Sequence, residues 1–179
     1  MTAVIDIPTA LTPAETELLQ SLARDKYVLE VGALLGYSTV VLAQVAKQVI
    51  SIDPHEGYPD NNPRPTWQTY RENLARHGVK DKVLPYKATW QEVAAHDEGG
   101  LPAPYDMVFM DLTGRYEDTM ELLMYLHPEW GWRLKTIAVH DCGHPDWPGV
   151  DRAVEEFREF MGMHAKFQQV DRLGVFTYV

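Results

Sequence analysis

Cysteine and basic charge are the scarce features of this sequence. Its 179 residues include one cysteine, and 16 Lys and Arg stand against 26 Asp and Glu, which gives a formal net charge of −10. One cysteine forms neither an intramolecular disulfide nor a cysteine-based zinc site, so a reducing compartment is expected. The shortage of basic residues argues against sequence-independent nucleic-acid binding, which needs a basic footprint.

Membrane and targeting segments are lacking as well. No run of about 18 consecutive apolar residues occurs, so we expect no membrane-spanning helix. The first ten residues contain Asp6 and Pro8 and lack the basic start of a signal peptide. With 45% hydrophobic residues the chain can nevertheless bury a substantial core. The sequence therefore predicts a soluble, cytoplasmic protein in which residues 1–179 form one domain.

Two kinds of apolar pattern alternate along the chain: apolar residues at helical spacing, and short continuous apolar runs that are typical of buried strands. Residues 12–24 are expected to form an N-terminal amphipathic helix, since Thr12 and Glu15 have the spacing of a capping box. Short apolar runs then alternate with helical patterns. The strands are expected at residues 27–32, 49–53, 83–87, 105–111, 136–141, 166–171 and 174–178. This order predicts a three-layer α/β fold with a mostly parallel seven-stranded sheet and an antiparallel C-terminal hairpin.

A glycine-rich turn follows the first expected strand. Residues 30–38 read Glu-Val-Gly-Ala-Leu-Leu-Gly-Tyr-Ser, and Gly32 and Gly36 would let the backbone approach a ligand closely. The spacing Gly-x-x-x-Gly is neither a P-loop nor the dinucleotide fingerprint, which disfavours a nicotinamide-dependent dehydrogenase. A tight turn that holds no ligand is the alternative interpretation.

With its acidic residue, this turn resembles that of class I S-adenosylmethionine (SAM) methyltransferases, and especially the catechol O-methyltransferase-like and bacterial sugar O-methyltransferase-related branches. The resemblance extends over about residues 15–179 and implies a Rossmann-like fold with SAM as cofactor. Asp53 would bind the ribose hydroxyls, and residues 82–92 would border the adenine. The cofactor-binding residues that the resemblance implies are Glu30, Gly32, Ala33, Gly36, Tyr37, Ser38, Asp53, Ala88, Thr89, Trp90 and Asp111.

Two carboxylates at strand ends are candidates for the chemistry. In the catechol-type branch, residues at the places of Asp111 and Asp141 bind Mg²⁺, followed by an asparagine where this sequence has Cys142. A thiol is a poor ligand for Mg²⁺, so metal-free general base catalysis by a histidine is the alternative. The candidate catalytic residues are Asp111, His140, Asp141 and His144, and the candidate ligands of Mg²⁺ or another divalent ion are Asp111 and Asp141.

The loops that follow the strands would recognise the methyl acceptor. The candidate residues there are Tyr58, Arg64, Trp67, Arg115, His144 and Trp147. The sequence shows almost no appended substrate domain. We therefore expect either a compact small-molecule acceptor or a homo-oligomer in which a partner chain completes the pocket, and we expect neither nucleic acid nor membrane as a partner.

The expected function is SAM-dependent methyl transfer to a small molecule, at a hydroxyl oxygen. Two alternatives keep SAM. One is a SAM-using enzyme that does not methylate, such as an aminopropyl transferase or a SAM-cleaving enzyme, because one fold supports many chemistries. The other is a non-catalytic SAM-binding module. A nicotinamide-dependent enzyme is the outermost alternative.

Overall fold

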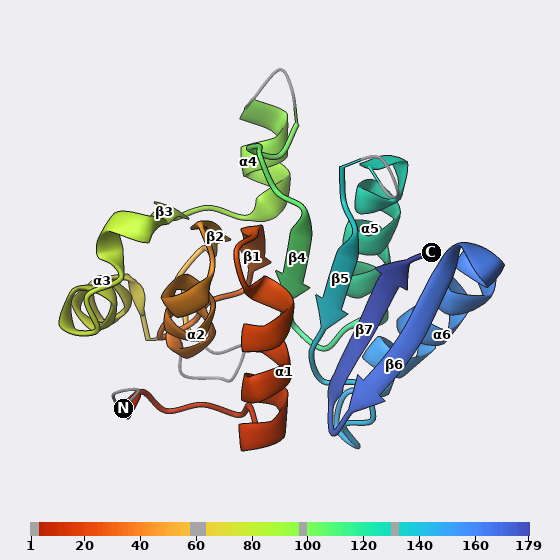
Figure 1. Ribbon diagram of the computed structural model, residues 1–179, viewed down its shortest axis with the longest axis horizontal. Coiled ribbons are helices and arrows are strands. Elements are labelled where there is room, and N and C mark those ends of the chain that lie inside the picture. The colour runs from red at the N-terminus through yellow and green to blue at the C-terminus, as the bar shows by residue number, and fades with distance from the viewer. Residues whose placement is uncertain (1–3, 58–63, 97–99, 130–132) are drawn as a thin grey trace.

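All seven strands lie in one sheet. The computed structural model describes residues 4–57, 64–96, 100–129 and 133–179 (Figure 1). The strands are β1 (Tyr27–Val31), β2 (Gln48–Ile52), β3 (Val83–Tyr86), β4 (Met107–Met110), β5 (Thr136–Val139), β6 (Ala165–Val170) and β7 (Leu173–Tyr178). Their order is β3-β2-β1-β4-β5-β7-β6. The first five are parallel, and β7 runs antiparallel to both β5 and β6. The predicted sheet is thereby confirmed.

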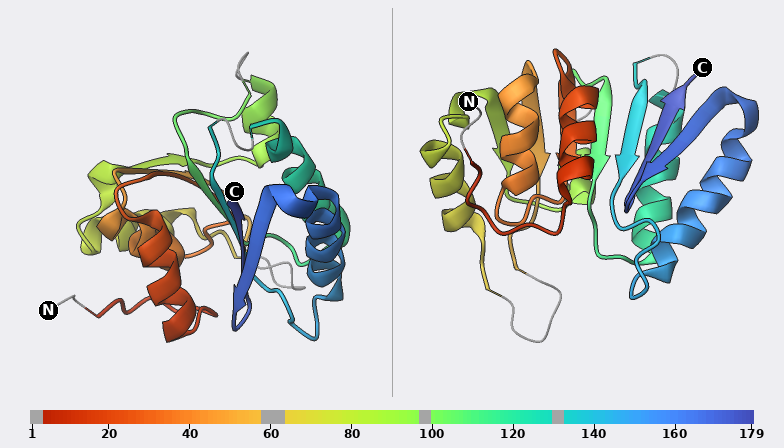
Figure 2. Two further views of the ribbon diagram at one scale, coloured as in Figure 1. Left: turned by 45° about the vertical axis from the view of Figure 1, so that its right-hand side comes forward. Right: turned by 60° about the horizontal axis from the view of Figure 1, so that its bottom comes forward.

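Helices cover both faces of this sheet. They are α1 (Pro13–Ala23), α2 (Tyr37–Val45), α3 (Trp67–Arg76), α4 (Trp90–His96), α5 (Tyr116–Leu126) and α6 (Pro148–Met161). Helices α1 to α3 pack against one face and α4 to α6 against the other, as the right-hand view of Figure 2 shows for α1, α2, α5 and α6. The three layers of the predicted α/β fold are thus present.

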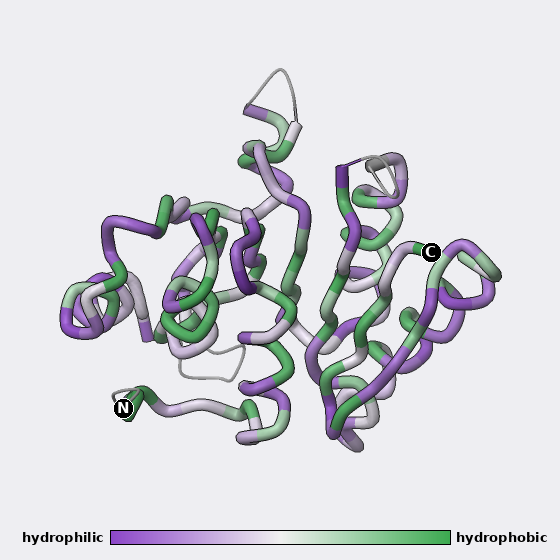
Figure 3. The backbone as a smooth tube through the Cα atoms, in the orientation of Figure 1, coloured by the Kyte–Doolittle hydropathy of each residue, from purple (hydrophilic) through white to green (hydrophobic). Residues whose placement is uncertain are grey.

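The sheet divides the hydrophobic core into two halves, because successive side chains of the central strands point to opposite faces. In β4, Met107 and Phe109 pack with residues of α1 to α3, whereas Val108 and Met110 pack with residues of α4 to α6. All four side chains are at most 1% exposed. Successive residues of a strand point to opposite faces, so a strand covered on both faces must be apolar throughout. Figure 3 shows the hydrophobic colouring along the inner strands.

The N-terminal helix begins as the sequence predicts. The Thr12 hydroxyl accepts from the backbone N–H of Glu15 at 3.2 Å, and the Glu15 carboxylate accepts from the N–H of Thr12 at 2.7 Å. This reciprocal pair satisfies two N–H groups that the first helical turn would leave without a partner. Within the described residues, no helix combines the length and the apolar character needed to cross a bilayer.

The sheet reverses its order of connection between β1 and β4. The chain leaves β1 towards α2 on one face and leaves β4 towards α5 on the other. Loops that diverge in this way leave a crevice beyond the carboxyl ends of the two strands, which is where ligands bind in open α/β sheets. The structure has a cleft of about 980 Å³ at this edge.

Candidate active site

The cleft is lined by the segments that follow β1, β2, β4 and β5. The residues of these segments include Gly32, Ala33, Tyr37, Ser38, Asp53, Asp111, His140, Asp141, His144 and Trp147. Thr89, Trp90 and Gln91, from the segment after β3, line the cleft as well. The structure therefore brings together most of the site residues that the sequence predicts, from positions that are far apart in the chain.

The glycine loop passes very close to the end of β4. Gly32 has a φ of +91°, and a Cβ atom at this position would lie 1.9 Å from the carbonyl oxygen of Asp111. Gly36 has a φ of +89° and precedes the first turn of α2. Both positions need glycine, because a side chain would be strained in this backbone conformation. Gly36 itself is not among the residues that line the cleft.

Asp53 holds the glycine loop in place. Its Oδ2 accepts from the N–H groups of Ala33 and Leu34 at 2.7 and 2.8 Å, and its Oδ1 accepts from the N–H of His55 at 2.5 Å. A carboxylate oxygen has two lone pairs. Only Oδ1 therefore keeps capacity for another donor, which allows contact with one ribose hydroxyl rather than the bidentate contact that the carboxylate chemistry suggested.

Glu30 lies beneath the loop and not in the cleft. Its side chain is fully buried, and its two oxygens accept from the hydroxyl groups of Ser38, Thr39 and Ser51 at 2.5 to 2.7 Å. Burial raises the pKa of Glu30 to about 7, although these three hydrogen bonds act in the opposite direction. The expected direct contact between Glu30 and the cofactor does not fit this placement. Glu30 instead joins β1, β2 and the start of α2.

The segment predicted to border the adenine reaches the cleft in part. Thr89 and Trp90 line it, while Ala88 packs against the core and is not among the lining residues. Trp90 is 6% exposed and its ring centroid lies 5.1 Å from that of Tyr125. Its ring therefore packs in the core and also lines the edge of the cleft.

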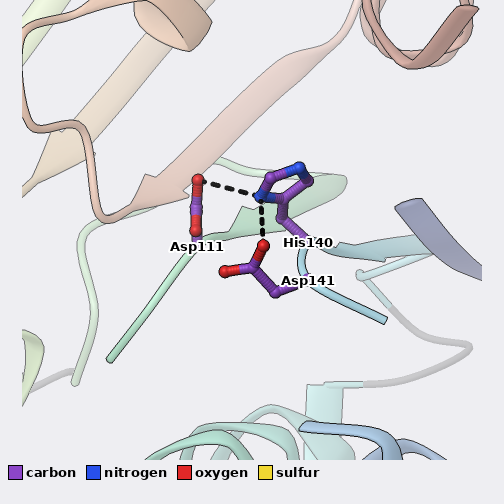
Figure 4. Close-up of side chains that lie close together, drawn as sticks. All are labelled: Asp111, His140 and Asp141. Carbon is purple, nitrogen blue, oxygen red and sulfur yellow. Dashed lines mark ion pairs between the residues drawn. The ribbon is translucent and has the colours of Figure 1, made fainter. Parts of the chain in front are cut away.

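The strand-end residues form a compact cluster on the other side of the glycine loop. Asp111 follows β4, and His140 and Asp141 follow β5 (Figure 4). The Nδ1 atom of His140 lies 3.3 Å from Oδ2 of Asp111 and 3.4 Å from Oδ1 of Asp141. Burial lowers the pKa of the His140 imidazole, but the carboxylates of Asp111, Asp141 and Glu15 outweigh burial and raise it.

Asp141 is held in an uncommon conformation. Its φ is +65°, in the left-handed region that Asp tolerates better than most residues. Burial and the neighbouring Asp111 raise the pKa of the Asp141 carboxyl. Strained backbone and two like charges held close together both cost stability. Their coincidence at one strand end is typical of a site kept for function.

Glu15 is a member of this region that the sequence did not reveal. It is fully buried, its Oε1 accepts from the N–H of Arg172 at 2.6 Å, and its Oε2 lies 3.6 Å from Nε2 of His140. The capping-box pattern explains why an acidic residue stands there. Its proximity to His140 is a tertiary contact that no local pattern shows.

Cys142 does not face the cluster. The side chain is 1% exposed and its thiol donates to the carbonyl oxygen of Val139 at 3.4 Å. Burial raises the pKa of this thiol to about 12. A neutral buried thiol of this kind is neither a nucleophile nor a metal ligand, so the residue at the asparagine position of the catechol-type branch contributes no ligand.

The predicted acceptor residues divide into two groups. His144 and Trp147 line the cleft, and Arg64, Trp67 and Arg115 do not. Trp67 instead packs with His55 and Tyr70 at centroid distances of 5.1 and 6.0 Å. Tyr58 lies outside the described residues.

Two lining segments come from opposite ends of the chain. Residues 8–11 and Arg172 both contribute to the cleft, and a guanidinium nitrogen of Arg172 donates to the carbonyl oxygen of Ala10 at 2.8 Å. The Thr12 hydroxyl also donates to the Asp171 carboxylate at 2.6 Å. These contacts attach the turn between β6 and β7 to the segment that precedes α1.

Comparison with known proteins places this fold and cleft among methyltransferases. A family model described as a methyltransferase domain matches residues 29–144, more than half of the chain. A comparison with curated protein sequences gave no match.

Several solved structures share the fold at low sequence identity. Cofactor-bound Rv0187 from MTB has a TM-score of 0.70 at 20% identity, with 97% of this chain and 84% of that chain covered. The O-methyltransferase TomG from Streptomyces achromogenes, in complex with SAM, has a TM-score of 0.68 at 19% identity, with 95% and 82% covered. An rRNA methylase from Streptococcus thermophilus has a TM-score of 0.63 at 15% identity, with 96% and 99% covered. A structure described as an O-methyltransferase and one described as an rRNA methylase thus share this fold, so the fold alone does not determine the acceptor.

Proposed function

The chain belongs to the family of methyltransferase domains, and from this premise we propose that it transfers the methyl group of SAM to a hydroxyl oxygen of a small molecule. The observation that supports the proposal is the cleft of about 980 Å³, which joins the glycine loop to the Asp111–His140–Asp141 cluster. A donor at the loop and an acceptor at the cluster would meet at the end of β4.

The cofactor end of the cleft suits SAM. Ala33, Tyr37, Ser38 and Asp53 line one side, and Thr89 and Trp90 line the other. The remaining lone pair of Asp53 Oδ1 can accept from one ribose hydroxyl, and the acidic surroundings favour a cationic sulfonium. TomG, which has this fold, is described in complex with SAM. The buried Glu30 would act indirectly, by fixing the start of α2.

The cluster end suits an oxygen nucleophile. In an in-line displacement the acceptor oxygen bonds to the methyl carbon while the carbon–sulfur bond breaks, and S-adenosylhomocysteine leaves with the electron pair. The proton of the acceptor hydroxyl would pass to a carboxylate oxygen of Asp111 or Asp141. Trp147 and His144 would hold the acceptor against the cluster, since alignment supplies much of the rate in such a reaction.

The same cluster fits a divalent ion. Asp111, His140 and Asp141 each offer one ligand atom, and these atoms lie within 4.8 Å of one another. A bound ion would supply Lewis acidity that lowers the pKa of the acceptor hydroxyl.

The proposal extends to the surroundings of the enzyme. The buried free thiol of Cys142 fits a reducing compartment and supports the proposal of a cytoplasmic location. The acceptor would be a small molecule rather than nucleic acid or lipid. The cleft is open on one side. A second copy of the chain could complete the pocket there, in a homo-oligomer.

Binding of SAM tests the first half of the proposal. We expect SAM and S-adenosylhomocysteine to raise the melting temperature and to give a saturable calorimetric isotherm. Asp53→Asn should weaken SAM binding about tenfold or more, because the amide has one acceptor oxygen and cannot accept both from the loop N–H groups and from the N–H of His55. Asp81→Asn, an exposed change on the far side of β3, is the matched control.

Mass analysis of products tests the second half. A panel of small phenols, catechols and sugars should include an acceptor whose mass increases by one methylene unit in the presence of SAM. Stabilisation by NAD but not by SAM would overturn the proposal. Methylthioadenosine as a product, or SAM binding with no product from any acceptor, would instead support the non-methylating alternatives.

A further inference from the structure

The cleft has one strongly basic side chain among the described residues that line it. Five carboxylates line the cleft, and the only Lys or Arg beside them is Arg172, from the turn between β6 and β7. None of these carboxylates pairs with it: the ion pairs of arginine in the described part of the chain involve Arg76, Arg152 and Arg158. The charge of Arg172 therefore has no counter-ion among the described side chains.

The turn that carries Arg172 is fixed on three sides. Its backbone N–H donates to Oε1 of the fully buried Glu15 at 2.6 Å, and its carbonyl oxygen accepts from the N–H of Cys142 at 2.9 Å. A guanidinium nitrogen donates to the carbonyl oxygen of Ala10 at 2.8 Å. These contacts hold the side chain at the wall of the cleft, and all three partners lack a charge that could pair with the guanidinium or meet only the backbone of Arg172.

Two carboxylates close to Arg172 have other partners. Asp171, the preceding residue, accepts from the hydroxyl of Thr12 at 2.6 Å. Asp141 directs an oxygen towards Nδ1 of His140 at 3.4 Å (Figure 4). Burial raises the pKa of Asp141 and the positive charge of Arg172 opposes this rise, so the guanidinium lies near the strand-end cluster. The neighbouring acids thus leave the arginine available to a ligand.

The free edge of the guanidinium suits an anionic oxygen group. A guanidinium has five N–H donors in one plane, and the structure shows one bond from this group, to Ala10. The remaining donors fit two oxygens of one carboxylate or phosphate, which a planar guanidinium binds in a bidentate manner. We propose that Arg172 binds an anionic oxygen group of the methyl acceptor, so that the acceptor is a hydroxylated carboxylate or phosphate ester.

The position of Arg172 favours the acceptor over the cofactor as the source of this group. SAM also has a carboxylate, but the proposed function places SAM along the glycine loop and the acceptor at the Asp111–His140–Asp141 cluster. Arg172 is joined to the cluster side, because its carbonyl oxygen bonds to Cys142, the residue after Asp141. The inference rests on the proposed function for this assignment, and binding of the SAM carboxylate is a separate outcome of the test.

Charge should therefore determine which acceptors bind well. A neutral acceptor leaves the guanidinium without a counter-ion, whereas an anionic acceptor supplies one. A hydrogen bond between charged groups changes affinity by about 10- to 100-fold. The acidic side chains of the cleft repel an anion placed elsewhere, so they restrict the anionic end of the acceptor to the neighbourhood of Arg172.

The first test measures anion binding on the whole chain without SAM or acceptor. Arginine is labelled with nitrogen-15, and the Nε–H resonance of Arg172 is assigned by its loss in Arg172→Lys. Acetate and inorganic phosphate are titrated separately against chloride at constant ionic strength. We expect one or both to shift this resonance saturably and to leave that of Arg24, exposed at the far end of α1, unchanged. Equal shifts without saturation at both arginines would overturn the proposal.

The second test compares ligands that differ in charge on one scaffold. The probes are para-hydroxybenzoate and para-hydroxyphenyl phosphate against para-hydroxybenzyl alcohol, and glucuronate against glucose. Calorimetry measures their binding to the wild-type chain with S-adenosylhomocysteine. On at least one scaffold the anion should bind about 10- to 100-fold more tightly, and added salt should reduce this preference. The benzoate and the phosphate ester distinguish the two kinds of anion. Equal binding of charged and neutral probes on both scaffolds contradicts the inference.

Failure of the inference is distinguishable from failure of the proposed function. A chain that methylates neutral and anionic acceptors equally well overturns the inference alone. A chain in which Arg172 binds anions, but which forms no methylated product from any acceptor, overturns the proposed function and leaves the anion subsite in place.

Variants assign the preference to the guanidinium. Arg172→Gln should remove the preference for the anion, and Arg172→Lys should retain part of it, because an ammonium keeps the charge but not the planar fork. Arg24→Gln is the matched control and should keep the preference in full. If Arg172→Gln weakens SAM binding and leaves the preference unchanged, Arg172 binds the cofactor carboxylate and the proposal is wrong.

Discussion

At the scale of single residues, the acidic groups of the cleft region have separate roles. Glu30 is buried with three hydroxyl donors, Asp53 fastens the glycine loop, and Asp111 and Asp141 face each other across His140. Sequence reasoning assigned all four either to the cofactor or to the chemistry, because each lies at or near the end of an expected strand. Only the side-chain environment distinguishes the residue that supports the loop from those that are open to a ligand.

The buried carboxyl of Glu30 should make stability depend on pH. Its pKa of about 7 lies above the ordinary value of 4.5, so its contribution is fully present below about pH 4.5 and is lost as pH rises through 7. Glu30→Gln removes this dependence. In urea denaturation with a chelator present, the unfolding free energy of the variant relative to wild type should increase by about 3 kcal/mol from pH 5 to pH 8.

An exposed glutamate provides the comparison for this experiment. Glu17→Gln on α1 makes the same change in charge as Glu30→Gln, but at an exposed side chain. A difference profile for Glu30→Gln as flat as that of Glu17→Gln would show that the carboxyl of Glu30 has an ordinary pKa.

At the scale of elements, the loop after β1 depends on glycine at one point. Gly32→Ala should lower the unfolding free energy by about 2 kcal/mol or more, because the new methyl group would meet the backbone of Asp111 at a positive φ. Chemical denaturation measures this loss. The same change should also weaken binding of SAM, since it moves the loop and the end of β4 apart.

A second glycine separates the two causes of this loss. Gly78 also has a positive φ, of +70°, but a Cβ atom there would meet nothing within 4 Å. Gly78→Ala therefore incurs only the conformational cost of about 1 kcal/mol. Equal losses at the two positions would mean that the close approach of Gly32 to Asp111 is unimportant.

The sequence predicted the strands and helices more successfully than the tertiary contacts between distant segments. The apolar runs and capping residues are local signals, and they predicted every strand to within two residues at either end. Helix α6 begins at Pro148, a residue type that suits the first helical turn. The partnership of Glu15 with His140, and the orientation of Cys142, depend on packing between distant segments and have no local signature.

At the scale of the whole molecule, the two ends of the chain meet at the cleft. Arg172 donates to the carbonyl oxygen of Ala10, and residues 8–11 line the cleft beside it. Arg172→Met should release this segment, so that its backbone amides exchange with deuterium up to about tenfold faster. Hydrogen exchange with mass spectrometry measures the effect.

The control for this prediction is an arginine whose partners lie on α5 and α6. Arg152 bonds to Glu156 one turn along α6, and its guanidinium carbon lies 4.3 Å from the ring centroid of Tyr116 on α5. Arg152→Met should leave exchange in residues 8–11 unchanged. Faster exchange in both variants would indicate a general loosening of the fold and not the loss of one contact.

The late position of Arg172 has a consequence for biosynthesis. Ribosomes make the glycine loop, Asp53 and the cluster residues well before this turn, yet Glu15 and the segment before α1 gain their contacts with residues 171 and 172 only when those residues emerge. A nascent chain from which residues 171 and 172 have not yet emerged therefore lacks these contacts at one side of its binding site. Ligand capture should accordingly follow the docking of this turn onto the segment before α1.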